Sequence, residues 1–259
     1  MKRAIIYFAW GETHVLEAIE SAKTTLFMDI PVVLLTTDDS LGFLPDDHPF
    51  AEVLAFPITE EKRIIKTCLW DFIPDGYDSF LFLDVDTRVL LDIRFGFEMA
   101  ERWGIAVATA PDYSLDNHHG FDRVMAVADM PCLGQNQYNT GVIFFARRPD
   151  VETVFRSWKS LAYDLTERAP WRKDDQPFLT LAMEMHGFNP YTLSTNYNYR
   201  ALIGDHVSGD IRIWHSYAPV PDDVNTYRKP WPPRRFVGDR RFETPELKEW
   251  VRRKYEDGT

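Results

Sequence analysis

Two acidic residues, Asp84 and Asp86, stand directly after the apolar run Phe80 to Leu83. A continuous apolar run is typical of a strand buried on both faces of a parallel sheet, and ligands of such sheets bind beyond the carboxyl ends of the strands. If the extended form continues, both carboxylates point the same way. Converging carboxylates can bind Mg²⁺ or Mn²⁺, which often share oxygen ligands with substrate phosphates. The alternative is that the acids only cap and turn the strand end.

The elements expected to position these acids alternate between strands and helices. Short apolar runs predict strands, and apolar residues at helical spacing predict helices. The expected strands are residues 4–9, 31–37, 53–56, 80–83, 104–110, 141–146 and 211–214, and the expected helices are residues 12–27, 60–73, 150–166 and 244–255. This alternation indicates an α/β fold with a mostly parallel central sheet flanked by helices. The polar stretch 111–138 is expected to be a long binding loop.

The chain has 259 residues, which suits one large domain, or one domain with a tail. Its net charge of −11 makes it a poor general binder of nucleic acid, whose phosphates would repel it. The two cysteines, Cys68 and Cys132, do not form a disulfide framework. Residues 4–10 are apolar, but the run is too short to span a membrane and is expected to be the first strand. We therefore expect a cytoplasmic protein without a transmembrane segment.

The run Leu83 to Asp86 resembles the Asp-x-Asp motif of glycosyltransferases with the GT-A fold, a Rossmann-like nucleotide-diphospho-sugar transferase fold. Further stretches stand in the order expected for the retaining enzymes of glycosyltransferase family 8. They are Lys66, Asn139-Thr140-Gly141-Val142, Asp175-Gln176, His215 and Lys229-Pro230-Trp231. The resemblance implies a GT-A domain over residues 1–231 and a helical C-terminal tail over residues 232–259, packed on or extending the same domain.

The resemblance also implies a metal site. Asp84, Asp86 and His215 would hold Mn²⁺ (or Mg²⁺) together with the diphosphate of the donor, with Asp84 contacting the donor as well. Imidazole suits Mn²⁺ better than Mg²⁺. Lys66 and Lys229 would add positive charge at the diphosphate, where transition-state charge develops, although a lysine lacks the bidentate fork of arginine.

The sugar is expected to lie beside the two remaining motifs. Asn139 would hydrogen-bond a sugar hydroxyl, and Gly141 would let the backbone approach closely; the alternative is a simple turn entering a strand. By resemblance, Asp175 and Gln176 form the catalytic pair beside the reacting carbon. The alternative for this stretch is a helix cap supplied by Asp174 or Asp175.

The nucleoside is expected at the end of the first strand, near Ala9, Trp10 and His14. Trp10 or His14 can stack on a base, because every base offers a π-face; Trp10 can equally be plain core. Loop 111–138 would carry contacts to the acceptor. The candidate acceptor contacts are Asp112, His118 and Trp171.

The basic stretch 229–254 leaves three interpretations open. It can be a solvated charged face, a segment that faces the diphosphate, or a weak peripheral contact with a membrane surface.

Taken together, the resemblance implies a metal-dependent hexosyltransferase that moves a sugar from a nucleotide sugar to a glycan or other hydroxyl acceptor with retention. UDP-glucose and UDP-galactose are the favoured donors. One alternative is a phosphatase of the haloacid dehalogenase type, whose Asp-x-Asp-x-Thr/Val motif would have Arg88 at its last position. Another is a non-catalytic protein that binds a sugar nucleotide or glycan. A nucleotidyltransferase would need a Gly-rich N-terminal loop, which Trp10-Gly11-Glu12 does not supply.

Overall fold

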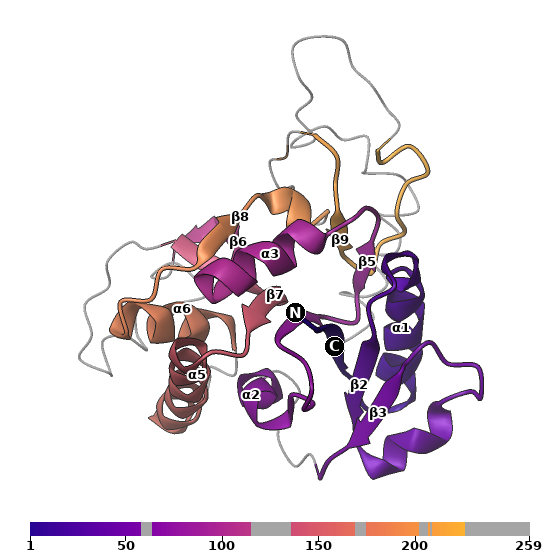
Figure 1. Ribbon diagram of the computed structural model, residues 1–259, viewed down its shortest axis with the longest axis horizontal. Coiled ribbons are helices and arrows are strands. Elements are labelled where there is room, and N and C mark those ends of the chain that lie inside the picture. The colour runs from indigo at the N-terminus through magenta and orange to yellow at the C-terminus, as the bar shows by residue number, and fades with distance from the viewer. Residues whose placement is uncertain (58–63, 115–135, 169–174, 202–206, 208, 226–259) are drawn as a thin grey trace.

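A seven-stranded sheet forms the centre of the computed structural model, which describes residues 1–57, 64–114, 136–168, 175–201, 207 and 209–225 (Figure 1). The strand order is β3-β2-β1-β4-β7-β6-β8. The strands are β1 (Arg3–Phe8), β2 (Val32–Thr36), β3 (Glu52–Ala55), β4 (Ser79–Leu83), β6 (Ile105–Ser114), β7 (Asn136–Ala146) and β8 (Tyr191–Leu193). Only β7 runs antiparallel to its neighbours, β4 and β6, and the other adjacent strands are parallel. The prediction of a mostly parallel α/β sheet is confirmed.

Helices cover both faces of this sheet. The α-helices are α1 (Glu12–Lys23), α2 (Leu69–Phe72), α3 (Arg94–Trp103), α5 (Pro149–Arg168) and α6 (Gln176–Met185), and the 3₁₀ segments are η1 (Leu26–Met28), η2 (Asp38–Phe43), η3 (Ile64–Cys68) and η4 (Thr195–Tyr197). Helices α1 and α3 pack on one face, and η3, α2, α5 and α6 pack on the other. The central strand β4 is buried along its whole length, because Phe80 and Phe82 face the α5 side and Leu81 and Leu83 face the α1 side.

A second, two-stranded sheet stands beside the main one. It pairs β5 (Thr87–Val89) with β9 (Ile213–His215) in antiparallel register. Figure 1 shows these two short strands next to each other, above the end of α1. Trp214 of β9 is fully buried in a small cluster of its own, which anchors the sheet.

Two predicted helices differ from the structure. Where one helix over residues 60–73 was expected, the described residues form the 3₁₀ segment η3 and a single α-helical turn, α2. The buried residues form the pairs Ile64–Thr67 and Ile65–Cys68, each three residues apart. A 3₁₀ helix, with three residues per turn, places such pairs on one face as an α-helix also does, so the apolar spacing does not distinguish the two. The expected helix 12–27 ends at Lys23 and continues as η1.

The sequence prediction also missed several short elements, namely α3, β5 and β8, while α6 was anticipated only as a cap ahead of Pro177. The expected loop 111–138 begins and ends inside the long strands β6 and β7, and residues 115–135 lie outside the described residues. The expected helix 244–255 lies outside them as well. Of the helices in the described part of the chain, none combines the length and the apolar character needed to cross a membrane.

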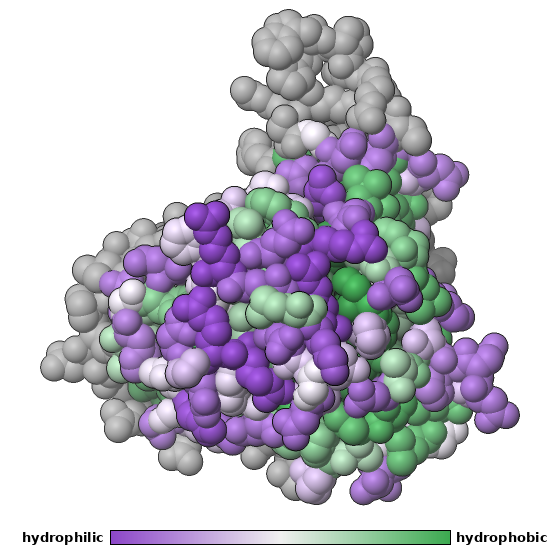
Figure 2. All heavy atoms as spheres, viewed as in Figure 1, coloured by the Kyte–Doolittle hydropathy of each residue, from purple (hydrophilic) through white to green (hydrophobic). Residues whose placement is uncertain are grey.

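The surface over α3 is polar, whereas apolar residues gather toward η2, where Leu41 and Phe43 are exposed (Figure 2). Helix α3 is therefore amphipathic: it turns Gly96, Phe97 and Ala100 onto the sheet.

Gly96 provides a test of this packing, because an added Cβ would lie 2.4 Å from the ring of Phe144 on β7. In a helix, Ala is normally more stable than Gly by about 0.5–1 kcal/mol. Phe144 is fully buried and has no room to move aside. We therefore expect Gly96→Ala to lower the free energy of unfolding by about 1–3 kcal/mol in urea denaturation. Gly42→Ala is the control, since no atom lies within 4 Å of its added Cβ, and equal effects of the two variants would contradict this packing.

Candidate active site

The chain turns immediately after β4. The N–H of Asp84 donates to the carbonyl of Gly141 at 2.8 Å, and the N–H and hydroxyl of Thr87 donate to the carbonyl of Asp84 at 3.1 and 2.7 Å. The expectation that the extended form continues through Asp86 is therefore wrong, because these bonds close a turn. The two carboxylates nevertheless lie together, since the turn carries Asp86 back beside the end of β4.

His215 joins the two acids through the register of the small sheet. It is paired with Thr87 across β5 and β9, and the N–H of Ser216 donates to the carbonyl of Asp86 at 2.9 Å. The Nε2 atom of His215 lies 3.3 Å from Oδ1 of Asp86 and 3.7 Å from Oδ2 of Asp84. One ligand atom from each of the three residues lies within 4.8 Å of the others. Two carboxylates and one imidazole form a donor set that fits Mn²⁺.

Lys66 of η3 contacts Asp84 and approaches Asp175. Its Nζ atom lies 2.8 and 2.7 Å from the two carboxylate oxygens of Asp84, and 3.8 Å from Oδ2 of Asp175. Burial lowers the pKa of Lys66, but the charges of Asp175 and Asp84 outweigh this effect and hold the pKa above its ordinary value. Lys66 is therefore a fixed positive charge at the site.

The pKa values of the two acids shift in opposite directions. Burial raises the pKa of Asp84, and the positive charges of Lys66 and His215 offset this only in part. Burial also acts to raise the pKa of Asp86, but the charge and hydrogen bond of His215 prevail and lower it to about 2. Of the two acids, Asp84 is therefore the one that takes up a proton at the higher pH.

Strand β7 brings its first residues to this edge of the sheet because it runs antiparallel to β4. The hydroxyl of Thr140 donates to Oδ2 of Asp175 at 2.5 Å, a contact that the sequence did not predict. Oδ1 of Asn139 accepts the N–H of Gly141 at 2.9 Å. Asn139 thus lies inside a strand and beside the acids.

Gly141 is packed directly against the imidazole of His215. An added Cβ would lie 2.1 Å from Cε1 of His215 and 2.8 Å from Oδ2 of Asp84. The close approach expected at this glycine is present, and the group that approaches is the histidine ring. A side chain at this position would force the ring away from the carboxylates.

Asp175 and Gln176 stand at the start of α6, ahead of Pro177. Asp175 occupies the N-cap position, yet its side chain makes no capping hydrogen bond and instead faces Thr140 and Lys66. The indole of Trp158 donates to the backbone carbonyl of Asp175 at 2.8 Å and fixes the start of the helix. The Nε2 of Gln176 lies 2.9 Å from Oε1 of Gln137, a buried residue that the sequence did not single out.

The residues expected around the nucleoside lie at the end of β1. Ala9 is buried, and Trp10 packs on the core with its ring edge-on to Phe8 at 6.0 Å. Nδ1 of His14 lies 3.2 Å from Oε2 of Glu17. This places His14 on the partly exposed side of α1 and Trp10 in the role of a core residue.

Two further residues beside the acids were missed by sequence reasoning. Burial raises the pKa of Tyr217, and the nearby charges of Asp86, Glu17 and Asp84 raise it further. Asn198 contacts the ring of His215 at 2.7 Å. In the sequence, the signal that could have pointed to Asn198 is its position between two tyrosines, in the stretch Asn196 to Tyr199.

Several predicted site residues lie outside what the structure describes. They are Lys229 with the rest of Lys-Pro-Trp, the side chain of Asp112, His118, Trp171 and the basic stretch 229–254.

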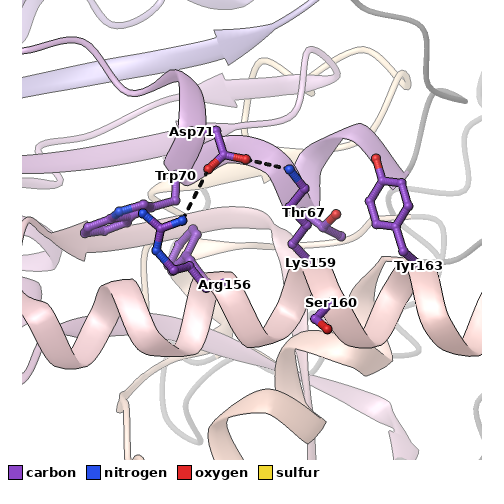
Figure 3. Close-up of a pocket in the computed structure, with 8 residues that line it drawn as sticks. Thr67, Trp70, Asp71, Arg156, Lys159, Ser160 and Tyr163 are labelled. Carbon is purple, nitrogen blue, oxygen red and sulfur yellow. Dashed lines mark hydrogen bonds and ion pairs between the residues drawn. The ribbon is translucent and has the colours of Figure 1, made fainter.

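A cavity of about 310 Å³ lies away from the acids, between the η3–α2 segment and α5 (Figure 3). On its rim, the carboxylate of Asp71 pairs with Lys159 at 2.7 Å and with Arg156 at 3.9 Å. These ion pairs tie α2 to α5. Thr67, Trp70 and Asp71 face the cavity, whereas Lys66 of the same segment contacts Asp84. The ion pairs of Asp71 therefore help to hold Lys66 in place.

The strand order, the reversed strand β7 and the acids at the end of β4 define the GT-A fold of nucleotide-sugar glycosyltransferases. The fold is similar to that of mouse xyloside xylosyltransferase 1, with a TM-score of 0.57 at 14% identity over 85% of this chain and 100% of the other. It is equally similar to the galactosyltransferase LgtC in complex with donor and acceptor sugar analogues, with a TM-score of 0.57 at 14% identity over 85% of this chain and 90% of the other.

A third similar structure is the glycosyltransferase GlyE of Streptococcus pneumoniae TIGR4, with a TM-score of 0.51 and 16% identity. The match covers 98% of this chain and 64% of that one. No protein family profile and no curated protein sequence matches the chain. The likeness to the solved structures is therefore one of fold.

Gly141→Ala tests whether the contact between β7 and His215 builds the cation site. We expect the affinity for Mn²⁺, measured by isothermal titration calorimetry, to fall at least about 10-fold, because the new methyl group displaces the ring. Gly96→Ala is the matched control: it also creates an overlap with a buried aromatic ring, but away from the carboxylates. If both variants bind Mn²⁺ as the wild type does, the ring position does not depend on Gly141.

Proposed function

We propose that the protein is a metal-dependent glycosyltransferase that moves a sugar from a nucleotide sugar to a hydroxyl group of a glycan or other acceptor, with retention. The observation that carries the proposal is the cluster of Asp84, Asp86 and His215 beyond the end of the central strand. The solved structures of this fold described above support it, since they are structures of glycosyltransferases. The GT-A fold is also not that of haloacid dehalogenase phosphatases, which removes that alternative.

In this proposal Asp84, Asp86 and His215 hold Mn²⁺ (or Mg²⁺) together with the donor diphosphate. The ion supplies charge neutralisation for the nucleoside diphosphate that leaves. Lys66 adds a second positive charge beside the carboxylate of Asp84. Lys229 has the same proposed role at the diphosphate, by resemblance. His14, partly exposed on α1, is assigned to the nucleoside together with Ala9, which is buried, and Trp10, which packs on the core.

The proposed reaction centre lies between α6 and the start of β7. Gln176 is the group assigned to the sugar beside the reacting carbon, and Gln137 steadies its amide. Asp175 accepts a hydrogen bond from Thr140 and faces Lys66, so its carboxylate already has two partners. In this proposal the carboxylate orients these groups, and retention follows from the resemblance to glycosyltransferase family 8. The leaving phosphate oxygen then takes the acceptor's proton.

UDP is the favoured nucleotide, by resemblance to glycosyltransferase family 8, with glucose and galactose as the leading sugars. The similar structures include a xylosyltransferase and a galactosyltransferase, so this fold serves more than one sugar. A non-catalytic sugar-nucleotide binder would share the cation site, and transfer or donor hydrolysis in the presence of Mn²⁺ separates the two functions.

Asp86→Ala tests the cation site. We expect UDP binding, followed by calorimetry with and without Mn²⁺, to lose its dependence on the metal. Mutation of a residue that only hydrogen-bonds to a metal ligand typically lowers affinity roughly 10–100-fold. The loss here should be larger, because Asp86 is itself a proposed ligand. Asp150→Ala is the control, since it removes an exposed carboxylate in the first turn of α5. The assignment fails if the Asp86 variant binds UDP as tightly as the wild type in both conditions.

The stereochemical outcome tests the reaction centre. Proton NMR of the product made from an α-linked UDP-sugar should show an α linkage, and a β linkage would show that Asp175 and Gln176 are misassigned. Gln176→Ala should lower kcat by roughly 10²-fold, the scale of one transition-state contact, while UDP affinity stays nearly constant. A parallel loss of UDP affinity would place Gln176 at the diphosphate instead.

A further inference from the structure

The ring of His215 is held from behind by a side chain that the proposed chemistry does not use. Nδ1 of the ring lies 2.7 Å from Oδ1 of Asn198, while Nε2 on the other edge faces Asp86 and Asp84. A neutral imidazole carries one N–H and one lone pair. The partner at Nδ1 therefore decides whether Nε2 presents a lone pair or a proton to the carboxylates.

A backbone group fixes the orientation of the amides behind the ring. The N–H of Gly141 can only donate, so the Asn139 atom 2.9 Å from it must be the carbonyl oxygen. The same oxygen lies 2.8 Å from the amide of Asn198, so that contact must come from the donating Nδ2. The remaining atom of the Asn198 amide is then its oxygen. It faces His215 and accepts a hydrogen bond from the N–H at Nδ1.

Burial gives this chain of hydrogen bonds its strength. Asn139 is 4% exposed and Asn198 is 2% exposed, so water is largely excluded as a competing partner. Tyr197 and Tyr199, on either side of Asn198, are also buried. If either amide were flipped, two donors or two acceptors would face each other in a site without water, which is energetically costly.

We propose that Asn198 is a positioning residue that holds His215 as the Nδ1–H tautomer and so leaves the Nε2 lone pair for a divalent cation between Asp84 and Asp86. The identity of the cation rests on the proposed function, whereas the tautomer rests on the hydrogen bonds alone. A ligating histidine usually donates its other N–H to a group behind it, and loss of that group typically costs about 10–100-fold in metal affinity. Asn198 belongs to no motif used to predict the site.

The first test needs no metal and no substrate. Nitrogen-15 NMR of the ring nitrogens of His215, in metal-free protein at a pH where the ring is neutral, should show a protonated Nδ1 and a bare Nε2. A proton on Nε2 in the wild type overturns the proposal, whether or not the protein is a glycosyltransferase.

Variants of Asn198 provide the second test. Asn198→Leu removes the acceptor and should release the tautomer preference and lower Mn²⁺ affinity about 10–100-fold in calorimetry. Asn198→Asp loses the hydrogen bond from Nδ2 to Asn139 but keeps an oxygen acceptor for Nδ1. It should retain the Nδ1–H signature, so it also serves if the leucine variant does not fold. Asn196→Leu is the matched control, because the Asn196 amide lies nearby but donates to the carbonyl of Asp210 and should leave both readouts unchanged.

The outcomes separate this proposal from the proposed function. Wild type with the Nδ1–H signature but no measurable Mn²⁺ affinity would overturn the cation site and, with it, the purpose assigned to Asn198. Strong Mn²⁺ binding that Asn198→Leu leaves unchanged would overturn the role of Asn198 alone.

Discussion

Repulsion among three carboxylates is the constraint on which the site depends. Asp84, Asp86 and Asp175 crowd the space beyond β4, and buried charges of one sign are costly unless opposite charge is supplied. In the described part of the chain, Lys66 supplies a positive charge from η3, close to Asp84 and Asp175. The Nε2 edge of His215 lies against Asp86 and Asp84 from β9. This arrangement leaves a position between Asp84, Asp86 and His215 where further positive charge is favoured.

The reversed direction of β7 makes that arrangement reachable. In a fully parallel sheet the first residues of β7 would lie at the edge opposite the end of β4. Running antiparallel, the strand instead delivers Asn139, Thr140 and Gly141 to the acids, and each of the three makes a separate contact there. The antiparallel direction of β7 thus supplies an acceptor at Asn139, a donor at Thr140 and, at Gly141, space for the ring of His215.

The sequence predicted what local patterns encode. Long apolar runs located the buried strands, and the acids at the end of Phe80 to Leu83 located the site. The helix over 60–73 was misjudged because its buried positions suit the three-residue repeat of a 3₁₀ helix as well as an α-helix. Strand β5 was missed because it has three residues and is stabilised by β9, far along the chain. Asn198 and Thr140 were missed for a related reason: their importance lies in partners distant in sequence, which no local pattern records.

The pairing of β5 with β9 has a consequence for how the molecule assembles. It joins segments nearly half the chain apart through three residue pairs. Closing so long a loop costs more chain entropy than forming a local contact does, and pairings of this kind form slowly. We therefore expect the small sheet to join late, after β1, β2 and β4 have paired. Because His215 belongs to this sheet and the two acids follow β4, an intermediate holding only the main sheet has an incomplete cation site. A divalent ion can thus distinguish the fully folded chain from one that has merely collapsed.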